Sequence, residues 1–460
     1  EYWEWQRKRH NIHWCRTVYR LLLTMAARDV FRNISLLLAV MRFFDCSGYR
    51  NAYNGGGVEG VILESPNEDV HAFFYLWYGE PKTDGRYLHW NHEVLPHWTK
   101  AVNDKYPDIG SVFEPPKSIH STYYPLRGCY SSKNVETLTS QFTEMKHAGI
   151  GVVVVSWWGR PSMPGTSDTQ GVNTDSAILM VLEAANLVEG GAMKVAFHLE
   201  PYPGRSAHTI RQDLRYITKK YGQSDSLLRW GERNLPLFYV YDSYHISLSE
   251  WEQLLLPAGT SSVRNTDIDG IFIGLWLEER HHTYLRVFDG FYTYFAATGF
   301  SYGSSLSNWQ TMSKWAKKYN KIFIASVGPG YDDTKIRPWN THNKRIRDNG
   351  RYYETMWRAA IEAEATIVSI TSYNEWGEGT QIEPALDQLE MQNGGEGAAA
   401  GADGEMALYE SYDDNPYQYL NQTLVLAREF RHDREREDAI NNLVDVVKAG
   451  LGQSHITDEL

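Results

Sequence analysis

The sequence predicts an α/β protein built on a (β/α)8 TIM barrel. Eight short segments rich in Val, Ile, Phe and Tyr alternate with helical patterns, and several of them, such as Val152–Val155, are apolar almost throughout. Continuous apolar strands are typical of a parallel sheet covered on both faces, and strand–helix alternation is typical of such a sheet. A doubly wound open sheet is the alternative, but no glycine-rich dinucleotide loop follows the first strand.

The predicted strands are each bounded by Gly, Pro, Asp or Asn. In chain order they are His71–Tyr78, Gly151–Trp157, Met193–Leu199, Pro236–Tyr241, Asp269–Trp276, Asp289–Phe295, Lys321–Val327 and Thr366–Tyr373. Helical patterns lie at Val135–His147, Asp175–Val188, Arg205–Tyr221, Ser247–Leu256, Ser305–Tyr319 and Arg345–Glu364. A charged helix near Tyr417–Arg436 is expected to pack across the barrel. Residues 61–460 are therefore predicted to form a single barrel domain.

Two segments lie outside this pattern. Residues 1–60 form an irregular basic segment, whose first 50 residues hold nine Lys and Arg against four Asp and Glu. Its best apolar run, Leu36–Val40, is far shorter than the about 20 residues that span a bilayer. No transmembrane helix or clear signal peptide is predicted, and membrane association through a missing or degraded N-terminal anchor stays open. Residues 390–408 are rich in Gly and Ala and are predicted to be a disordered insert.

The composition excludes several classes of protein. The 460 residues carry a net charge of −12, which argues against a general nucleic-acid binder. Three cysteines are too few for a disulfide-built scaffold or a four-cysteine zinc site, and their contexts predict inert thiols. Aromatic residues reach 13%, with 30 Tyr and 16 Trp. Sugar stacking and an ordinary aromatic core both explain that excess.

Polar and aromatic residues follow the predicted strands, where a barrel places its active site. They are Tyr78 after the first strand, Trp157 and Trp158 after the second, and His198, Glu200 and Tyr202 after the third, followed by Tyr292 and Tyr294 in the sixth and Asn374, Glu375, Trp376 and Glu378 after the eighth. Glu375 and Glu378 are three residues apart among glycines, so they can face one ligand. Paired carboxylates in different environments suit glycoside hydrolysis, whereas a solvated acidic turn is the plainer alternative.

A metal site is the other chemistry considered. Glu278–His282 contains adjacent Glu and His residues but lacks the His-Glu-x-x-His spacing of a zinc helix, and a charged helix start explains it better. His89, His92 and His97 are weaker ligand candidates, and His198 suits a hydrogen bond to a substrate hydroxyl. No metal and no cofactor is therefore predicted.

Six ordered motifs between about His71 and Pro384 resemble those of the endo-α-1,2-mannosidases of glycoside hydrolase family 99. They are FFYLWYGEP with DGRYLHWNHEVLPHW, VVVVSWWGRP, FHLEPYPGR, FDGFYTYFAATGFSYGSS, VGPGYDDTKIRPWN and SYNEWGEGTQIEP. The resemblance implies a metal-independent, retaining (β/α)8 enzyme that cleaves inside mannose chains. It releases glucosylated mannose oligosaccharides from high-mannose N-glycans, or it acts on α-mannan.

The resemblance also implies roles for individual residues. Glu378 carries over as the general acid and Glu375 as the general base, which in this family deprotonates the substrate's own 2-hydroxyl to give a 1,2-anhydro sugar. An axial 2-hydroxyl anti to the leaving group gains a large effective molarity. A glycosyl-enzyme through Glu375 is the mechanistic alternative. Trp158 occupies a position that is Trp or Tyr in the family and bears on the terminal sugar.

The remaining alternatives concern function and compartment. A catalytically silent carbohydrate-binding barrel is the alternative to an enzyme, and the presence of both Glu375 and Glu378 argues against it. A metal hydrolase is the third. The sequons at Asn33 and Asn421 and a C-terminal Thr-Asp-Glu-Leu indicate the secretory pathway. The Golgi lumen is expected, with retention in the endoplasmic reticulum or secretion open.

Overall fold

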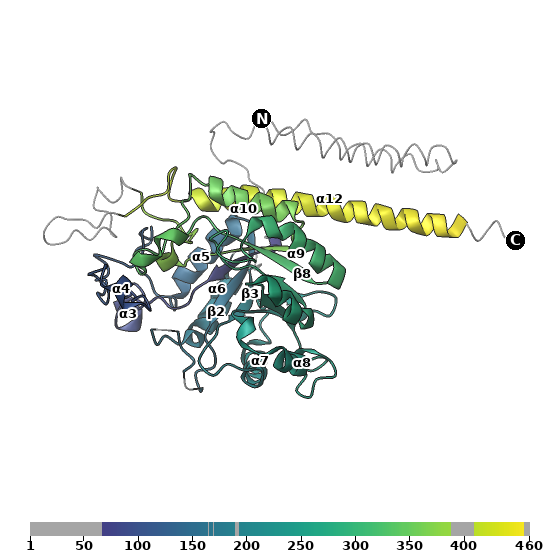
Figure 1. Ribbon diagram of the computed structural model, residues 1–460, viewed down its shortest axis with the longest axis horizontal. Coiled ribbons are helices and arrows are strands. Elements are labelled where there is room, and N and C mark those ends of the chain that lie inside the picture. The colour runs from purple at the N-terminus through teal and green to yellow at the C-terminus, as the bar shows by residue number, and fades with distance from the viewer. Residues whose placement is uncertain (1–66, 164, 169, 189–192, 388–408, 455–460) are drawn as a thin grey trace. The chain divides into compact units, whose positions relative to one another are not determined.

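The computed structural model describes residues 67–163, 165–168, 170–188, 193–387 and 409–454 (Figure 1). The chain divides into two compact units, Glu1–Ile62 and Leu63–Leu460. The first unit and the predicted insert 390–408 both lie outside the described residues. All of the described residues therefore belong to the second unit.

Eight parallel strands close into a barrel. Their order is β1 (Asn67–Phe74), β2 (Ile150–Trp157), β3 (Lys194–Leu199), β5 (Leu235–Val240), β6 (Ile271–Leu275), β7 (Gly290–Tyr292), β8 (Ile322–Val327) and β9 (Ile367–Ile370), which pairs back onto β1. The short strand β4 (Arg229–Trp230) pairs with β5, antiparallel to it, and with no other of the described strands. The predicted (β/α)8 class is confirmed, and the open sheet is wrong.

Helices connect the strands (Figure 1). In order they are α5 (Val135–His147), α6 (Ile178–Leu187), α7 (Ala207–Tyr221), α8 (Leu248–Leu255), α9 (Leu306–Tyr319), α10 (Arg351–Glu362) and α12 (Gln418–Ser454). Between β6 and β7 the connection is the 3-10 helix η4 (Glu279–Val287) instead of an α-helix. Short helices sit in the loops: α3 (Pro81–Asp84), α4 (Lys100–Asn103), η2 (Thr174–Ala177), η3 (Ser243–His245), η5 (Pro338–Asn343) and η6 (Trp376–Glu378).

Local sequence accounts for these elements. All eight residues of β2 are buried, as expected for a strand covered on both faces. The helices α7 and α8 each begin at a capping box, in which the Ser206 and Ser247 hydroxyls accept from the backbone N–H three residues on. These caps start the helices soon after β3 and β5, so the intervening loops lie at the C-terminal ends of the strands.

The last helix completes the outer ring. α12 contacts α5, α10 and β1. The Tyr353 hydroxyl on α10 lies 3.0 Å from the Thr423 hydroxyl, and Arg358 pairs with Glu429 at 3.1 Å. The predicted packing of this helix against the barrel is confirmed. Of the helices the structure describes, none is both long and apolar enough to cross a membrane.

Candidate active site

Aromatic side chains fill the middle of the barrel. The Phe73 ring centroid of β1 lies 4.8 Å from that of His198, 5.5 Å from Tyr239 and 5.8 Å from Tyr292. All four side chains are essentially inaccessible to solvent. Because this layer is packed, a ligand can bind only above it, at the C-terminal ends of the strands.

A second layer lies one pleat higher. Alternate strand residues share a face, so the residues two positions after the first layer continue toward the mouth. These residues are Tyr75, Glu200, Tyr241 and Tyr294, and all are buried or half-buried. The Tyr241 and Tyr294 rings lie 4.7 Å apart, and the hydroxyls of Tyr75 and Tyr294 are hydrogen-bonded to each other. Hydroxyl and carboxylate groups thus form the floor of the barrel mouth.

The predicted carboxylates stand on a closed loop after β9. The N–H of Ser372 donates to the carbonyl of Thr380 at 2.9 Å, which joins the two ends of the loop. Gly379 has φ +61°, and a Cβ there would lie 2.8 Å from the carbonyl oxygen of Asp332. The N–H of Asp332 in turn donates to the carbonyl of Glu378 at 2.8 Å. Glycine is therefore needed where this loop passes the segment after β8.

Glu375 lies against the second aromatic layer and is 7% exposed. Its Oε2 accepts a hydrogen bond from the Tyr294 hydroxyl at 3.3 Å. Burial raises the pKa of Glu375 well above 4.5, and the charge of Glu378 raises it further. Hydrogen bonding to Tyr75 lowers that pKa, whereas the charge of Glu200 again raises it.

Glu378 is more open, with 24% of its side chain exposed. Its Oε1 lies 3.3 Å from Nη1 of Arg337, and the same Nη1 donates to Asp333 at 3.0 Å. Asp333 is buried and is also held by the side-chain amide of Asn340 at 2.9 Å. Burial raises the pKa of Glu378, Arg337 opposes the rise, and Asp333 adds to it.

The two carboxyls therefore bind a proton more tightly than free carboxylates do, and their surroundings differ. Glu375 is buried against tyrosine hydroxyls, whereas Glu378 has an arginine beside it and access to solvent. Burial and the charge of Glu378 favour the neutral form of Glu375, and Arg337 favours the ionised form of Glu378. A pair of carboxyls in contrasting environments can exchange acid and base roles during a reaction.

Several predicted binding residues meet beside this pair. Nε2 of His198 lies 2.7 Å from the Tyr292 hydroxyl, and Nδ1 lies 3.0 Å from Oε1 of Glu200. The Ser156 hydroxyl donates to the same Glu200 oxygen at 2.8 Å. Tyr292 is fully buried in the first layer, so its hydroxyl orients His198. Glu200 lies nearer the mouth, where it also acts electrostatically on Glu375.

Other predicted residues hold the loop that carries Glu375 and Glu378. The Tyr78 hydroxyl donates to the carbonyl of Asn374 at 2.8 Å. The side chain of Asn374 accepts from the N–H of Tyr75 at 2.7 Å and donates to its carbonyl at 3.1 Å. Trp376 is fully buried, and its Nε1 donates to Glu383 at 2.9 Å. These three side chains connect the loop to β1 and to the core.

The predicted residues after β2 and β3 point in different directions. Trp157 is fully buried, with Nε1 donating to Asp175 at 3.0 Å, and the Tyr202 hydroxyl is hydrogen-bonded to buried Asp213. Both side chains pack against the outer helices and not into the mouth. Trp158 is half-buried, and its indole N–H has no hydrogen-bond partner among the described residues. An orphaned donor of this kind is free to bind a ligand oxygen.

Sequence reasoning missed Tyr75, Tyr241, Arg337 and Asp333. The two tyrosines could have been found from strand periodicity, because each follows an interior residue by two positions. Arg337 carries no such signal, since it lies in a loop and reaches Glu378 from 41 residues away in sequence.

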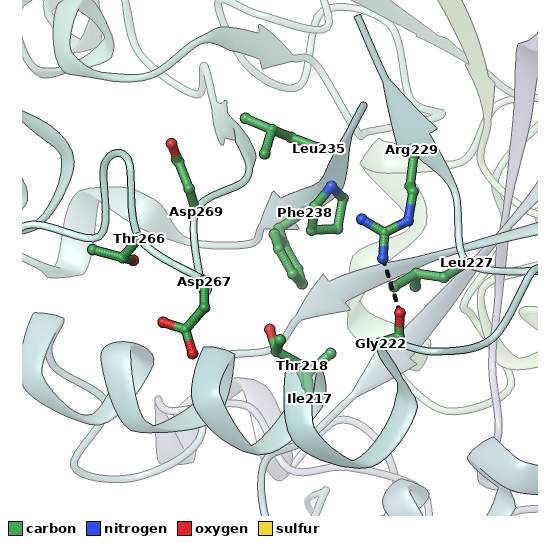
Figure 2. Close-up of a pocket in the computed structure, with 11 residues that line it drawn as sticks. Ile217, Thr218, Gly222, Leu227, Arg229, Leu235, Phe238, Thr266, Asp267 and Asp269 are labelled. Atoms are coloured by element: carbon green, nitrogen blue, oxygen red, sulfur yellow. Dashed lines mark hydrogen bonds between the residues drawn. The ribbon is translucent and has the colours of Figure 1, made fainter. Parts of the chain in front are cut away.

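Two other candidate sites are the metal site considered at Glu278–His282 and the pocket in Figure 2. Among the described residues, no three His, Cys, Asp or Glu side chains gather as metal ligands, including those of Glu278–His282. The pocket in Figure 2 is lined by residues such as Ile217, Leu235 and Asp269, and lies at the N-terminal ends of the strands. The candidate active site is at the other end of the barrel.

Comparison with known proteins gives the family. The model of "Glycosyl hydrolase family 99" matches residues 65–393, which include every predicted site residue. This chain belongs to glycosyl hydrolase family 99. It is a glycoside hydrolase, and the resemblance drawn from its motifs is confirmed.

Relatives in this family include human and rat proteins. The chain is 46% identical over 323 residues to a human "Glycoprotein endo-alpha-1,2-mannosidase-like protein", covering 69% of each chain. It is 46% identical over 325 residues to a rat "Glycoprotein endo-alpha-1,2-mannosidase", covering 70% of this chain and 68% of the relative. A solved "GH99 endo-alpha-mannosidase from Bacteroides thetaiotaomicron" has a TM-score of 0.69 at 39% identity, covering 80% of this chain and 99% of that one.

Proposed function

We propose that this family 99 enzyme is a retaining endo-α-1,2-mannosidase with Glu375 and Glu378 as its catalytic pair. The observation that carries the proposal is the position of both carboxyls on one loop at the barrel mouth, with raised pKa values and contrasting neighbours. The printed names of the relatives, endo-alpha-1,2-mannosidase and endo-alpha-mannosidase, support the bond that it cleaves.

In the proposed first step Glu378 protonates the glycosidic oxygen as the C1–O bond breaks. Glu375 removes the proton of the 2-hydroxyl, and that oxygen attacks C1 to close a 1,2-anhydro ring. In the second step water opens the ring at C1, giving its proton to Glu378 while Glu375 returns a proton to O2. Both carboxyls end as they began. The exposed part of Glu378 leaves room for the leaving group and then for water.

In the free enzyme the proton is favoured on Glu375, whereas the proposed first step needs it on Glu378. Burial favours neutral Glu375, and Arg337 favours ionised Glu378. A bound substrate changes this balance, because its 2-hydroxyl donates a hydrogen bond to ionised Glu375. The leaving oxygen beside Glu378 in turn accepts a hydrogen bond from its protonated form. Direct attack by Glu375 on C1 is the alternative route, and it would give a glycosyl-enzyme.

The proposed substrate is a high-mannose N-glycan carrying terminal glucose, and the products are a glucosylated mannose oligosaccharide and the shortened glycan. Trp158 and the His198–Glu200 pair suit the sugars on the non-reducing side, because they offer an aromatic face and hydrogen-bonding groups near Glu375. An α-mannan is the second candidate substrate, supported by the named activity of the bacterial relative. Processing of N-glycans would place the enzyme in the secretory pathway, with the Golgi lumen proposed.

A time course on reducing-end-labelled glycans tests the proposal. One glycan ends in glucose and one ends in mannose, and both are followed by NMR in the presence of a chelator. Release of a disaccharide or larger fragment, formed first as the α anomer, is the expected result. Release of single sugars, or a β anomer formed first, would contradict an endo-acting or a retaining enzyme respectively. Binding without cleavage would favour the silent barrel.

A further inference from the structure

An exposed cluster of aromatic rings stands on loops at the active-site end of the barrel, and the proposed reaction does not use it. Trp98 is 82% exposed, the largest fraction among the large apolar side chains of the described residues. Its ring lies 3.7 Å from that of His97 and 5.4 Å from that of Trp339, and the His97 and Trp339 rings are 4.8 Å apart. Three clustered rings, one of them almost fully in water, mark an interaction site more often than a folding requirement.

Hydrogen bonds hold two of the three rings, those of His97 and Trp339, on which Trp98 packs. The N–H of His97 donates to the Asn103 side chain at 2.6 Å, and Nδ1 of His97 accepts from the N–H of Thr99 at 2.9 Å. Trp339 Nε1 donates to the carbonyl of Leu95 at 3.1 Å. The two held rings give Trp98 a fixed surface to pack on, which lowers the conformational freedom that is lost when a ligand stacks there.

The segments that carry the cluster also reach the catalytic pair. Trp98 lies in the long segment after β1 and Trp339 in the segment after β8, so both leave the barrel at the end that carries Glu378. Trp339 is two residues beyond Arg337, a span of at most about 7 Å along the backbone, and Arg337 contacts Glu378. A chain of sugars leaving the site past Glu378 would therefore meet these rings.

We infer that His97, Trp98 and Trp339 form a carbohydrate-stacking platform for mannose residues on the leaving-group side of the cleaved bond. The inference rests on the proposed function, in which Glu378 protonates the oxygen of the leaving group. The apolar C–H face of a pyranose packs on an indole ring, and its hydroxyls stay in water at so exposed a position. The platform binds the part of the glycan that remains after cleavage, and the enzyme therefore favours long substrates over short ones.

The kinetic test compares two substrates in Trp98→Ala. One is an intact high-mannose glycan, and the other is an aryl glycoside of the released fragment, which has no sugar after the cleaved bond. KM for the intact glycan should rise about three- to tenfold with kcat unchanged, and the aryl glycoside should be cleaved as by the wild type. Trp98→Tyr, which keeps a ring, should restore most of the loss. Tyr417→Ala removes an aromatic side chain of 42% exposure at another site and should change neither substrate.

A binding measurement keeps this test separate from the proposed function. The dissociation constant of the free oligomannose glycan is measured by calorimetry for the wild type and for Trp98→Ala. Weaker binding by the variant supports the platform even if the wild type cleaves neither substrate, which would overturn only the proposed function. Equal binding overturns the platform. A loss seen with a glycopeptide but not with the same free glycan also overturns it, since the rings would then recognise polypeptide.

Discussion

The two proposed catalytic carboxyls differ at the scale of single atoms. Glu375 meets tyrosine hydroxyls in a buried site, and Glu378 meets a guanidinium near solvent. In the proposed reaction each residue acts through its carboxyl, and glutamine cannot replace it because an amide neither accepts nor releases the proton. The neighbouring hydroxyl and guanidinium groups can also form hydrogen bonds with an amide. Loss of the proton carrier can therefore be separated from loss of the fold.

Glu375→Gln and Glu378→Gln should each lower kcat by about 10²- to 10⁴-fold on the glucose-capped glycan, because each removes a positioned acid or base. Circular dichroism should show an unchanged fold. Glu183→Gln, on the exposed face of α6, is the matched control and should keep wild-type activity. Near-normal turnover by either active-site variant would show that its carboxyl is not catalytic.

Arg337→Gln tests which carboxyl must be protonated. Arg337 lowers the pKa of Glu378, so its removal should raise that pKa further. Because Glu378 holds its proton less tightly than Glu375 in the free enzyme, the pKa of Glu378 sets the acidic limb of the kcat/KM profile, and that limb should move to higher pH. If the protonated form of Glu378 is the active one, as a general acid requires, the maximum of kcat/KM should rise, and if its ionised form is the active one, the maximum should fall. Arg351→Gln, at an exposed arginine on α10, should leave both limbs in place.

At the scale of elements, the loop that carries the proposed catalytic pair depends on a buried anchor, Glu383. Glu383 is fully buried and accepts hydrogen bonds from Trp376 (2.9 Å), Tyr130 (2.7 Å), Gln141 (2.7 Å) and Arg127 (2.8 Å). Trp376 lies between the two proposed catalytic residues in sequence, and its bond ties the loop to Glu383 just beyond the loop's end. Since charge-assisted hydrogen bonds are the stronger ones, this contact fixes the turn on which Glu375 and Glu378 stand.

Trp376→Phe removes the donor to Glu383 and keeps an aromatic ring. We expect kcat to fall about tenfold or more, because a small displacement of a catalytic group is costly in rate, and stability to fall by about 1–3 kcal/mol. Trp309→Phe is the control, since buried Trp309 on α9 also donates from Nε1, to Gly303 at 2.7 Å. It should lower stability similarly without lowering kcat. An equal loss of kcat in both variants would mean that the loop contact has no special role.

The elements also show where sequence patterns stop being informative. The strand predicted at His71–Tyr78 is β1, Asn67–Phe74, because Tyr75, Leu76 and Tyr78 are buried in the mouth and look apolar without being paired in the sheet. The strand predicted at Asp289–Phe295 ends at Tyr292, since Tyr294 adopts φ 55°. Burial and strand pairing coincide within the barrel wall but separate at its mouth, where the proposed catalytic pair lies.

For the whole molecule, the alternation of apolar and amphipathic segments is enough to predict the barrel, and it predicts the end at which the proposed site lies. It could not predict which side chains meet there. Arg337 reaches Glu378 from a different loop, and Tyr202 turns to Asp213 instead of the mouth. Such contacts depend on loop paths that no periodicity encodes, whereas the two glutamates were identified because the motif keeps them within one turn.

Burial of Glu375 should also lower the stability of the whole protein, by an amount that depends on pH. The folded-state pKa of Glu375 lies well above its unfolded value of 4.5, so the folded protein binds more protons and stability falls as pH rises from 4.5 toward that folded pKa. Glu375→Gln removes the titration. Its melting temperature should therefore exceed that of the wild type by about 1–3 °C at pH 7, with a smaller difference at pH 4.5. Differential scanning calorimetry at both pH values measures this, with Glu183→Gln as the control. A difference that does not change with pH would mean that Glu375 ionises in the folded protein as easily as in the unfolded chain.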